Sequence, residues 1–364
     1  MGERGCGHDA RRGCPLYLDA AATTPLHPRV LSRIREALAA KAGRGQAEAR
    51  DRAAELVGVV PEAIWFVPSG SAANNAVLRL AADGGWPVVS QPSEHPSVLR
   101  PLKALEARGH PVHWLGLRSG RVDPGELERV LGSPGTRPVL VSIMAVNHET
   151  GLRQPVEAIG EVCRQRGALF HCDAVQAWRT LDVDPSGPHY LSLSAHKLEG
   201  PKGVAALVVD ARAPRPQAEF DPGPALLEGF VAALELRRER GPAWRAALED
   251  SRDALQERLA ALPGARVHGS GPRAPGHLCV SFAGFSGDAL VSELDLQGIA
   301  CSSGSACSSG AGEPSPVLLA TGASAAEATG SLRFSLVEPL LGGDVEHVAR
   351  CLERALRRLA ELAP

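Results

Sequence analysis

Short apolar segments alternate with amphipathic segments through the first two-thirds of this chain of 364 residues. The apolar segments are rich in β-branched and aromatic residues, which favours strands, whereas the others repeat apolar residues at helical spacing. Val156, Ile159 and Val162, for example, share one helical face before the glycine at position 167. This alternation predicts an α/β fold with a mostly parallel sheet between layers of helices. The expected strands cover residues 64–67, 87–91, 111–115, 138–146, 168–175, 190–194 and 203–209.

The character of the sequence changes after Asp210. A proline-rich passage, ARAPRPQAEFDPGPA, precedes a long helical pattern over 225–262 that Gly241 and Pro242 interrupt. Short strands, a Ser/Gly-rich loop and a final helix follow, which predicts a smaller α+β domain. We therefore expect a flexible N-terminal extension over 1–16, a large domain over 17–222 and a small domain over 223–364.

Charge and cysteine usage narrow the functions that this chain can have. A net charge of -2 argues against a nucleic-acid partner, which needs a basic face. No segment approaches the roughly 20 apolar residues of a membrane span, and no secretory signal is visible, so we expect a cytoplasmic protein without a membrane partner. The eight cysteines are then reduced thiols, and their spacing includes no zinc or other metal motif.

The stretch SLSAHKLEGPKG, residues 192–203, carries the strongest chemical signal. An expected strand ends there in Ser194, His196 and Lys197, and ligands of α/β sheets bind at strand ends. A lysine amine can form a Schiff base with a carbonyl compound, which arginine cannot. Lysine is also rare here, with four among 39 basic residues. The alternative is a surface turn with an ordinary cation.

A second signal is Asp173 in HCDAVQAW, which ends a strand flanked by apolar residues. A buried carboxylate is costly unless it is paired. The pyridinium nitrogen of pyridoxal phosphate is one such partner, and the carboxylate keeps that nitrogen protonated so that the ring can accept electrons. The alternative is an aspartate that caps a turn or a helix.

Eight motifs in this order resemble the cysteine desulfurase family, within the class V aminotransferase group of pyridoxal-phosphate enzymes. They span about Tyr17 to Leu336 and read YLDAAATTPL, SEHPSV, VNHETGLRQP, HCDAVQ, SLSAHKLEGPKG, SSGSACSS, EPSPVLLATG and LRFSL. The resemblance implies the fold type I of pyridoxal-phosphate transferases, with a sheet sandwiched by helices and a smaller C-terminal domain. It also implies a homodimer.

The resemblance implies a role for each polar residue around the cofactor ring. Lys197 would hold pyridoxal 5'-phosphate covalently and later move the Cα proton of the substrate. His95 would stack on the ring and assist that proton transfer. Asp173 would bond the ring nitrogen, while Asn147 and Gln176 would bond the phenolic oxygen.

The remaining implied roles concern the phosphate, the substrate and the nucleophile. Ser194 and His196 would contact the phosphate, together with the loop that holds Gly70, Ser71 and Ala72. Arg333, with Asn147, would bind the L-cysteine substrate, the arginine gripping its carboxylate as a fork. Cys307 would attack the substrate sulfur, leaving a persulfide on the enzyme and releasing alanine. A pliable Ser/Gly loop suits a thiol that must reach the substrate and then deliver sulfur to an acceptor protein, for example in iron–sulfur cluster assembly.

Three segments depart from the family pattern. In PSGSAANNAV, Ala72 stands where the family has a threonine, so Ser71 and backbone N–H groups would hold the phosphate instead. The N-P-S-S-x-H segment after the first helix is missing. The stretch that supplies a phosphate contact across the dimer is cut to RPQAEFDPGPALLEGF and lacks its Gly-Thr pair.

Two other functions stay open at this point. One is another class V lyase or aminotransferase in which Cys307 is incidental, and the other is a degenerate homologue that acts as an interaction protein. The other cysteine of the loop, Cys301, follows the expected end of a short strand. We expect it to be a partly buried, small apolar residue, the alternative being a residue that accepts or relays sulfur.

Overall fold

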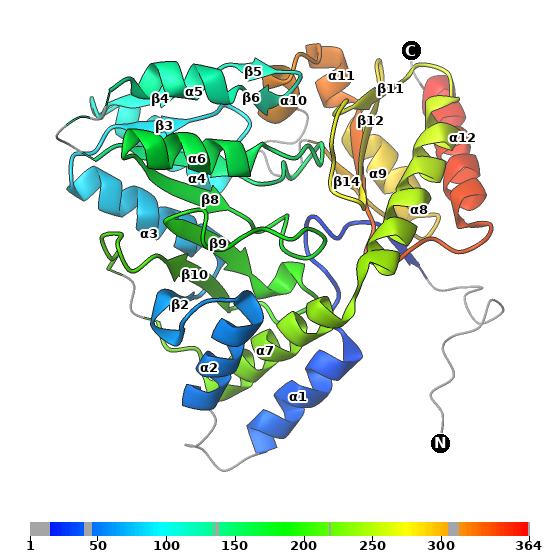
Figure 1. Ribbon diagram of the computed structural model, residues 1–364. Helices are drawn as coiled ribbons and strands as arrows, with labels where there is room; N and C mark the ends of the chain where they lie inside the picture. Colours follow the sequence, from blue (N-terminus) through cyan, green and yellow to red (C-terminus); the bar gives the residue numbers. More distant parts are fainter. Residues whose placement is uncertain are drawn as a thin grey trace.

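A computed structural model describes residues 15–39, 46–133, 135, 138–217, 220–304 and 313–362. These residues form a large α/β layer structure, beside which lies a smaller α+β unit with α8, α9 and α12 (Figure 1). The α/β class predicted from the alternating segments is thus confirmed, and so is the smaller C-terminal unit.

The large sheet has seven strands in the described residues, and each expected strand is present. All neighbours pair in parallel except β10, which runs antiparallel to both β9 and β2. Across the sheet the order is β2 (Ile64–Val67), β10 (Ala205–Val209), β9 (Tyr190–Ser194), β8 (Leu169–Asp173), β7 (Leu140–Met144), β3 (Val88–Ser90) and β4 (Val112–Trp114).

Helices cover both faces of this sheet. Alternate side chains along each strand point to opposite faces of the sheet, so each strand contributes residues to two hydrophobic cores. On one face, apolar residues of the strands pack against α3 (Gly70–Asp83) and α4 (Pro96–Glu106). On the other face they pack against α5 (Pro124–Leu131), α6 (Val156–Arg166) and α7 (Pro224–Glu239).

Two further helices and some short elements complete this unit. α1 (Pro28–Ala39) and α2 (Gln46–Val57) pack against α7 at the bottom of Figure 1. The short elements are 3₁₀-helix η1 (Pro61–Ala63), 3₁₀-helix η2 (Ala195–Lys197) and the hairpin of β5 (Leu117–Arg118) with β6 (Arg121–Val122).

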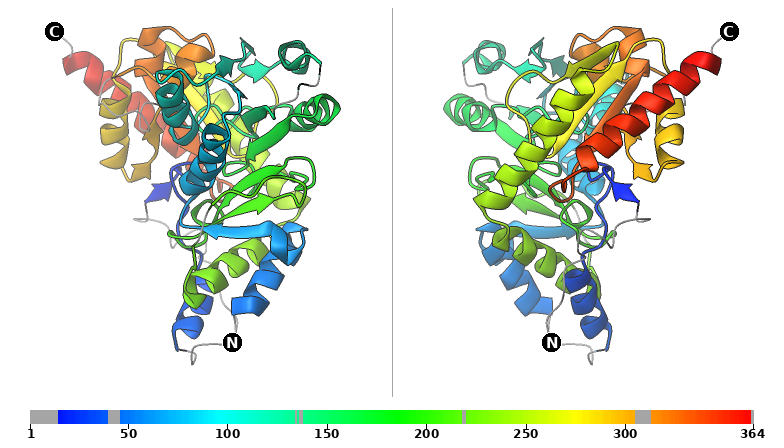
Figure 2. Two further views of the ribbon diagram at one scale, coloured as in Figure 1. Left: turned by 90° about the vertical axis from the view of Figure 1, so that its left-hand side faces the viewer. Right: turned by 90° about the vertical axis from the view of Figure 1, so that its right-hand side faces the viewer.

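The smaller unit is built on an antiparallel sheet. Its order is β11 (Ala265–His268), β12 (His277–Phe282), β15 (Ser331–Ser335) and β14 (Ser302–Ser303). The helices around it are α8 (Pro242–Ala260), α9 (Gly287–Asp295), α10 (Pro316–Ala320), α11 (Ala325–Thr329) and α12 (Asp344–Leu362). Figure 2 shows α8 and α12 side by side along its outer side.

The boundary between the two units differs from the expected one. α7 was assigned to the small domain, but its Leu227, Phe230 and Leu234 are buried in the core of the large sheet. The chain enters the smaller unit only at α8, after the break at Gly241 and Pro242. The N-terminal strand β1 (Leu16–Tyr17) belongs to the smaller unit instead, since it pairs in parallel with β13 (Ile299–Ala300). The segment from β1 to α1 therefore links the two units. Of the N-terminal extension expected over 1–16, residues 1–14 lie outside the described residues.

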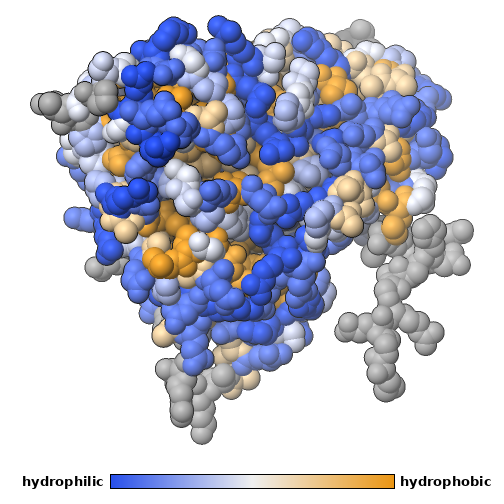
Figure 3. Space-filling model, in the orientation of Figure 1, coloured by the Kyte–Doolittle hydropathy of each residue, from blue (hydrophilic) through white to orange (hydrophobic). Residues whose placement is uncertain are grey.

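The surface is mostly polar on the face shown in Figure 3, where apolar residues gather in the central part. In the described part of the chain, every helix is too short or too polar to span a lipid bilayer. The described residues also hold no cluster of three His, Cys, Asp or Glu side chains arranged for a metal ion.

Candidate active site

A cavity of about 240 Å³ opens at the carboxyl ends of the parallel strands, where ligands of such sheets bind. Its walls come from the turns after β2, β7, β8 and β9, from the start of α4 and from the N-terminal segment. The lining residues are Ala21, Ala22, Ser69, Gly70, Ser71, Asn74, His95, Ser97, Met144, Val146, His148, Asp173, Val175, Gln176, Ser194, His196 and Lys197.

Lys197 enters this cavity from η2, directly after β9. Its Nζ donates hydrogen bonds to the backbone carbonyls of Ala21 and of Ala22, the latter at 2.7 Å. These carbonyls hold the amine at the strand end, inside the cavity. A primary amine at this position can form a Schiff base with a carbonyl compound.

Asp173 is the last residue of β8, and its carboxylate faces α3 across the cavity. Oδ2 accepts a hydrogen bond from Asn74 Nδ2 at 2.6 Å, and Oδ1 accepts one from the backbone N–H of Val175 at 3.0 Å. Asp173 is 7% exposed. These neutral donors fix its orientation and leave its negative charge available for a cationic partner.

The N-terminus of α3 forms another wall of the cavity. The side chain of Ser69 caps this helix by accepting from the backbone N–H of Ala72 at 3.1 Å. A Cβ on Gly70 would lie 2.7 Å from Val175 Cγ2, so the backbone here approaches the turn after β8 more closely than another residue would allow. The exposed N–H groups and the helix dipole favour an anion at this point.

Ser194 lies next to that helix end, since its Cβ would be 3.5 Å from a Cβ on Gly70. Its buried Oγ has no hydrogen-bond partner among the described residues. His196 lines the same side, where its Nδ1 lies 3.1 Å from Thr23 Oγ1. Burial and the charges of Lys197 and Lys202 lower the pKa of His196 to about 4, so its ring is neutral.

His95 begins α4, and its Nδ1 accepts from the backbone N–H of Ser97 at 3.1 Å. Its ring meets that of His148 edge to face, with 5.0 Å between the centroids. Burial lowers the pKa of His95 and lowers that of His148 well below its ordinary value. Both rings are therefore neutral at physiological pH, and each keeps one N–H donor and one acceptor nitrogen.

The expected contact between Asn147 and the cofactor needs correction, because the side chain of Asn147 forms hydrogen bonds within and beside the turn after β7. Oδ1 accepts from the backbone N–H groups of Glu149 and Thr150, at 3.0 and 2.8 Å, while Nδ2 donates to Ser93 O at 2.9 Å. These bonds shape the turn and use both ends of the amide. Asn147 does not line the cavity, and the next residue, His148, does.

Arg333 lies in β15, buried at 1% exposure, beside the cavity rather than in its wall. One arm, Nη2, pairs with Asp19 Oδ1 at 2.8 Å, and Nη1 donates to the backbone carbonyl of His148 at 3.1 Å. The guanidinium is thus oriented from two sides. The expected role of Arg333 toward a substrate carboxylate stays a prediction.

Asn74 and His148 are among the cavity residues that were not predicted from the sequence. Asn74 bonds Asp173, and His148 faces His95. Asn74 falls one helical turn after the N-terminus of α3, and this spacing places it on the same face as Gly70 and Ser71. Gln176 was expected, and it is fixed through a bond from Nε2 to Ala21 O at 2.9 Å.

The two cysteines of the Ser/Gly loop differ in what the structure describes. Cys307 lies outside the described residues. Cys301 directly follows β13 and is 8% exposed, in agreement with the expected small apolar residue at a strand end. Burial raises the pKa of its thiol to about 12, so almost none of it is thiolate at neutral pH.

These residues fit pyridoxal phosphate. The fit rests on the unpartnered Ser194 Oγ and Asn74 Oδ1, which face a cavity with an anion-binding helix end at one side and a carboxylate at the other. An unsatisfied buried hydroxyl beside a helix N-terminus matches a phosphate, and the Asp173 carboxylate matches a protonated ring nitrogen. Lys197 supplies the amine.

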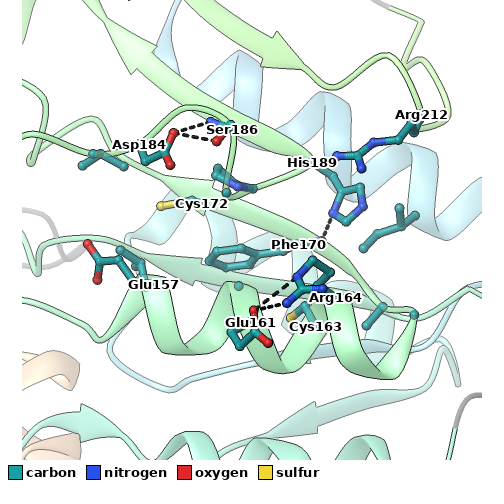
Figure 4. Close-up of a pocket in the computed structure, with 18 residues that line it drawn as sticks. Glu157, Glu161, Cys163, Arg164, Phe170, Cys172, Asp184, Ser186, His189 and Arg212 are labelled. Carbon is teal, nitrogen blue, oxygen red and sulfur yellow. Dashed lines mark hydrogen bonds and ion pairs between the residues drawn. The ribbon is translucent and has the colours of Figure 1, made fainter. Parts of the chain in front are cut away.

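A second groove, lined by α6, β8 and the loops around 183–189 and 212, has charged side chains as well (Figure 4). Arg164 pairs with Glu161 at 2.5 Å, and Asp184 Oδ1 accepts from the Ser186 hydroxyl at 2.7 Å. Cys163 and Cys172 also line the groove, and burial raises the pKa of both thiols. None of the expected site residues that the structure describes lines this groove.

The fold and the cavity define an enzyme of the pyridoxal-phosphate class with one lysine at a strand end. The family model "Aminotransferase class-V" matches residues 16–228 and 222–347 of this chain. The chain belongs to this family, whose members depend on pyridoxal phosphate.

Within this family the chain belongs to the cysteine desulfurases. It is 37% identical over 388 residues to the cysteine desulfurase IscS of Anaeromyxobacter sp. (strain Fw109-5), covering 96% of this chain and 94% of that one. A solved NifS-like protein superimposes with a TM-score of 0.82 at 28% identity, covering 94% of this chain and all of the other. SspA, solved in complex with cysteine, gives a TM-score of 0.73 at 28% identity and covers 89% of this chain and 99% of its own.

Proposed function

We propose that this protein binds pyridoxal 5'-phosphate through Lys197 and converts L-cysteine to L-alanine, with transfer of the sulfur to Cys307. The observation that carries the proposal is the cavity itself, in which an amine, a carboxylate and a helix N-terminus converge at the strand ends. The complex of the related SspA with cysteine supports the choice of substrate.

Each end of the cavity has a separate task. Asp173, oriented by Asn74 and Val175, would hold the ring nitrogen in its protonated form. The start of α3 and the Ser194 hydroxyl would hold the phosphate. When bound, pyridoxal phosphate supplies the electron sink that makes the substrate Cα proton acidic. Lys197 Nζ takes this proton, and the neutral ring of His95 stays within the same pocket to assist.

Arg333 recognises the substrate carboxylate with its fork of N–H donors. Asp19 and the carbonyl of His148 hold the guanidinium in one orientation before the substrate arrives. Preorganisation of this kind lowers the entropic cost of binding. In the sequence, the loop of Cys307 follows β14, and β14 pairs with β15, the strand that carries Arg333.

The sulfur step balances without an external oxidant. The thiolate of Cys307 attacks the substrate sulfur, an S–S bond forms, and the bond between that sulfur and the substrate Cβ breaks. The sulfur atoms are oxidised to the persulfide level, and Cβ is reduced, receiving a proton to become the methyl group of alanine. The outer sulfur atom of this persulfide then passes to a thiol of an acceptor protein.

We further propose that the missing family segments change how the cofactor and a second subunit are held. Ala72 supplies a backbone N–H to Ser69 and has no hydroxyl for a phosphate, so Ser71 and the helix end carry more of that role.

The expected homodimer would be detected by light scattering after gel filtration. A protein that stays monomeric but active would remove the dimer from the proposal.

The test of the function measures sulfide and alanine release from L-cysteine in the presence of a thiol reductant, which releases the persulfide sulfur as sulfide, together with the visible absorbance of the bound cofactor. We expect yellow protein with equal yields of both products. Lys197→Ala should abolish the colour and the turnover, whereas Lys202→Ala, an exposed lysine of the same turn, should change neither.

Cys307→Ser should keep the colour and lose sulfide release. Unchanged release in Cys307→Ser would favour another class V reaction. A wild-type protein that stays colourless after incubation with excess cofactor would refute the proposal and favour an interaction protein.

A further inference from the structure

Glu199, two residues after Lys197, has a backbone conformation that its residue type disfavours. Its φ is +62°, and among the described residues Ser119 is the only other non-glycine residue with a positive φ. The left-handed region costs free energy for any residue with a Cβ, so such a residue persists only where its surroundings hold it. Strain directly after a reactive lysine suggests a function, and the contacts of Glu199 indicate which one.

The main chain of Glu199 is held by the N-terminal segment. Its N–H donates to Thr24 Oγ1 at 2.7 Å, and its carbonyl accepts from the N–H of His27 at 3.0 Å. Thr24 also bonds the carbonyl of His196, through its N–H at 2.9 Å and through its hydroxyl at 2.8 Å. These bonds fix the path of the main chain on both sides of Lys197.

The side chain of Glu199 forms a buried ion pair with Arg240. The glutamate side chain is 6% exposed and the arginine side chain 12% exposed, so salt screens this pair less than a surface pair. Nη1 of Arg240 donates to Oε1 of Glu199, and Nη2 donates to Oε2 at 3.2 Å. One guanidinium thus engages both carboxylate oxygens, which fixes the direction of the contact as well as its length.

Arg240 connects this pair to the smaller unit. It ends α7, directly before the break at which the chain enters α8 (Figure 1). Its Nη2 also donates to Glu338, which follows β15, and its guanidinium carbon lies 4.6 Å from the ring centroid of Trp244 in α8. Trp244 Nε1 donates in turn to Glu338 Oε2 at 2.8 Å. The contacts of Arg240 therefore run from the turn of Lys197 to the unit whose strand β15 carries Arg333.

We propose that Glu199 is a positioning residue, which acts through Arg240 on the turn that carries Lys197. The ion pair holds this turn in a fixed relation to the smaller unit, and so to Arg333. This inference rests on the proposed function, in which Lys197 Nζ takes the Cα proton of a substrate whose carboxylate Arg333 binds. Because these two groups belong to different units, a loose link between the units would move the amine away from the proton. A misplacement of about 1 Å can slow a catalysed step by about 100-fold.

The experiment separates the proton transfer from the sulfur step by using L-alanine, the proposed product. In deuterium oxide, the cofactor-loaded protein should exchange the Cα proton of alanine for deuterium, and proton NMR measures the loss of the Cα–H signal. Glu199→Gly removes the carboxylate and relieves the positive φ, while Arg240 keeps Glu338 as a partner. We expect exchange to be about tenfold slower or more, with the thermal midpoint of unfolding within about 5 °C of the wild type.

Three further variants test the cause of that loss. Glu199→Gln keeps an acceptor for Arg240 and should retain most of the exchange rate. Ser119→Gly relieves a positive φ in the hairpin of β5 and β6, and Glu239→Gln removes the charge of an exposed ion pair with Arg29 on the same helix, α7. Neither control should change the exchange rate.

The outcomes separate this inference from the proposed function. Wild-type protein that lacks the cofactor colour or the exchange would refute the proposed function, and this inference with it. If the wild type shows both, an unchanged rate in Glu199→Gly, or an equal loss in Ser119→Gly, would refute the role of Glu199 alone. Glu199→Gln as slow as Glu199→Gly would mean that the hydrogen bonds from Arg240 do not position the turn, and would overturn the proposal.

A second variant covers the case in which Glu199→Gly does not fold or melts far below the wild type. Glu199→Asn adopts a positive φ more readily than glutamate and has a shorter side chain without a charge. It should show the same slow exchange as expected for Glu199→Gly. A wild-type exchange rate in Glu199→Asn would overturn the proposal.

Discussion

Glu94 should make the stability of this protein fall as the pH rises, and Glu94→Gln should remove that dependence. The side chain is fully buried beneath the site. Oε1 accepts from Gln91 Nε2 at 2.7 Å and from the backbone N–H of Met144 at 2.8 Å, whereas Oε2 has no partner among the described residues. Burial raises the pKa of this carboxyl to about 8.

The sign follows from proton binding in the two states. The folded protein keeps the proton on Glu94 up to a pH of about 8, while the unfolded chain releases it near its ordinary pKa of 4.5. Between these values the folded state binds more protons, so the free energy of unfolding decreases with rising pH. The range from pH 6 to pH 8 spans two units at about 1.4 kcal/mol each, or about 3 kcal/mol.

Glutamine has the same shape as protonated glutamate and keeps the acceptor that Gln91 and Met144 use. In urea titrations, Glu94→Gln should therefore gain stability over the wild type by about 3 kcal/mol more at pH 9 than at pH 6. Glu257→Gln, at an exposed position of α8, serves as the control and should show no such gain. A difference between Glu94→Gln and wild type that is the same at both pH values would refute the reasoning.

Three further predictions concern backbone and side-chain geometry. Gly151→Ala should lower the free energy of unfolding, measured in thermal melts, by about 2–4 kcal/mol, because the φ of Gly151 is +72° and a Cβ there would lie 2.3 Å from the Cβ of His277. The control is Gly284→Ala, where φ is +91° but the space around the glycine is open. This substitution should lower the free energy of unfolding by only about 1–2 kcal/mol. Arg333→Lys should raise the KM for L-cysteine about tenfold or more with a smaller change in kcat, since lysine pairs with Asp19 but lacks the fork; an unchanged KM would remove Arg333 from substrate binding. Cys301→Ala should leave sulfide release nearly intact, and a loss as large as that in Cys307→Ser would reverse the assignment of the nucleophile.

Much of the fold could be predicted because the periodicity that it depends on is local. Strand 190–194 was expected with the bounds that β9 has, and the break at Gly241 and Pro242 separates α7 from α8 as expected. The domain boundary was misplaced because a proline-rich passage is only a local signal. α7 packs in the core of the large unit because it contacts α1 and α2. The residues around 222 carry no information about where those two distant helices lie.

The site shows the same limit at the scale of one residue. Lys197, Asp173 and Ser194 could be placed because each lies in or directly after a regular element, where alternation and strand ends determine the direction of a side chain. Asn147 and His148 lie in a turn, and there a shift of one position exchanges the residue that faces the ligand for the one that faces the backbone. Asn147 is the residue better suited to the turn, because its amide can accept from two consecutive backbone N–H groups, as it does from Glu149 and Thr150. The position in the wall of the cavity is therefore taken by the next residue, His148.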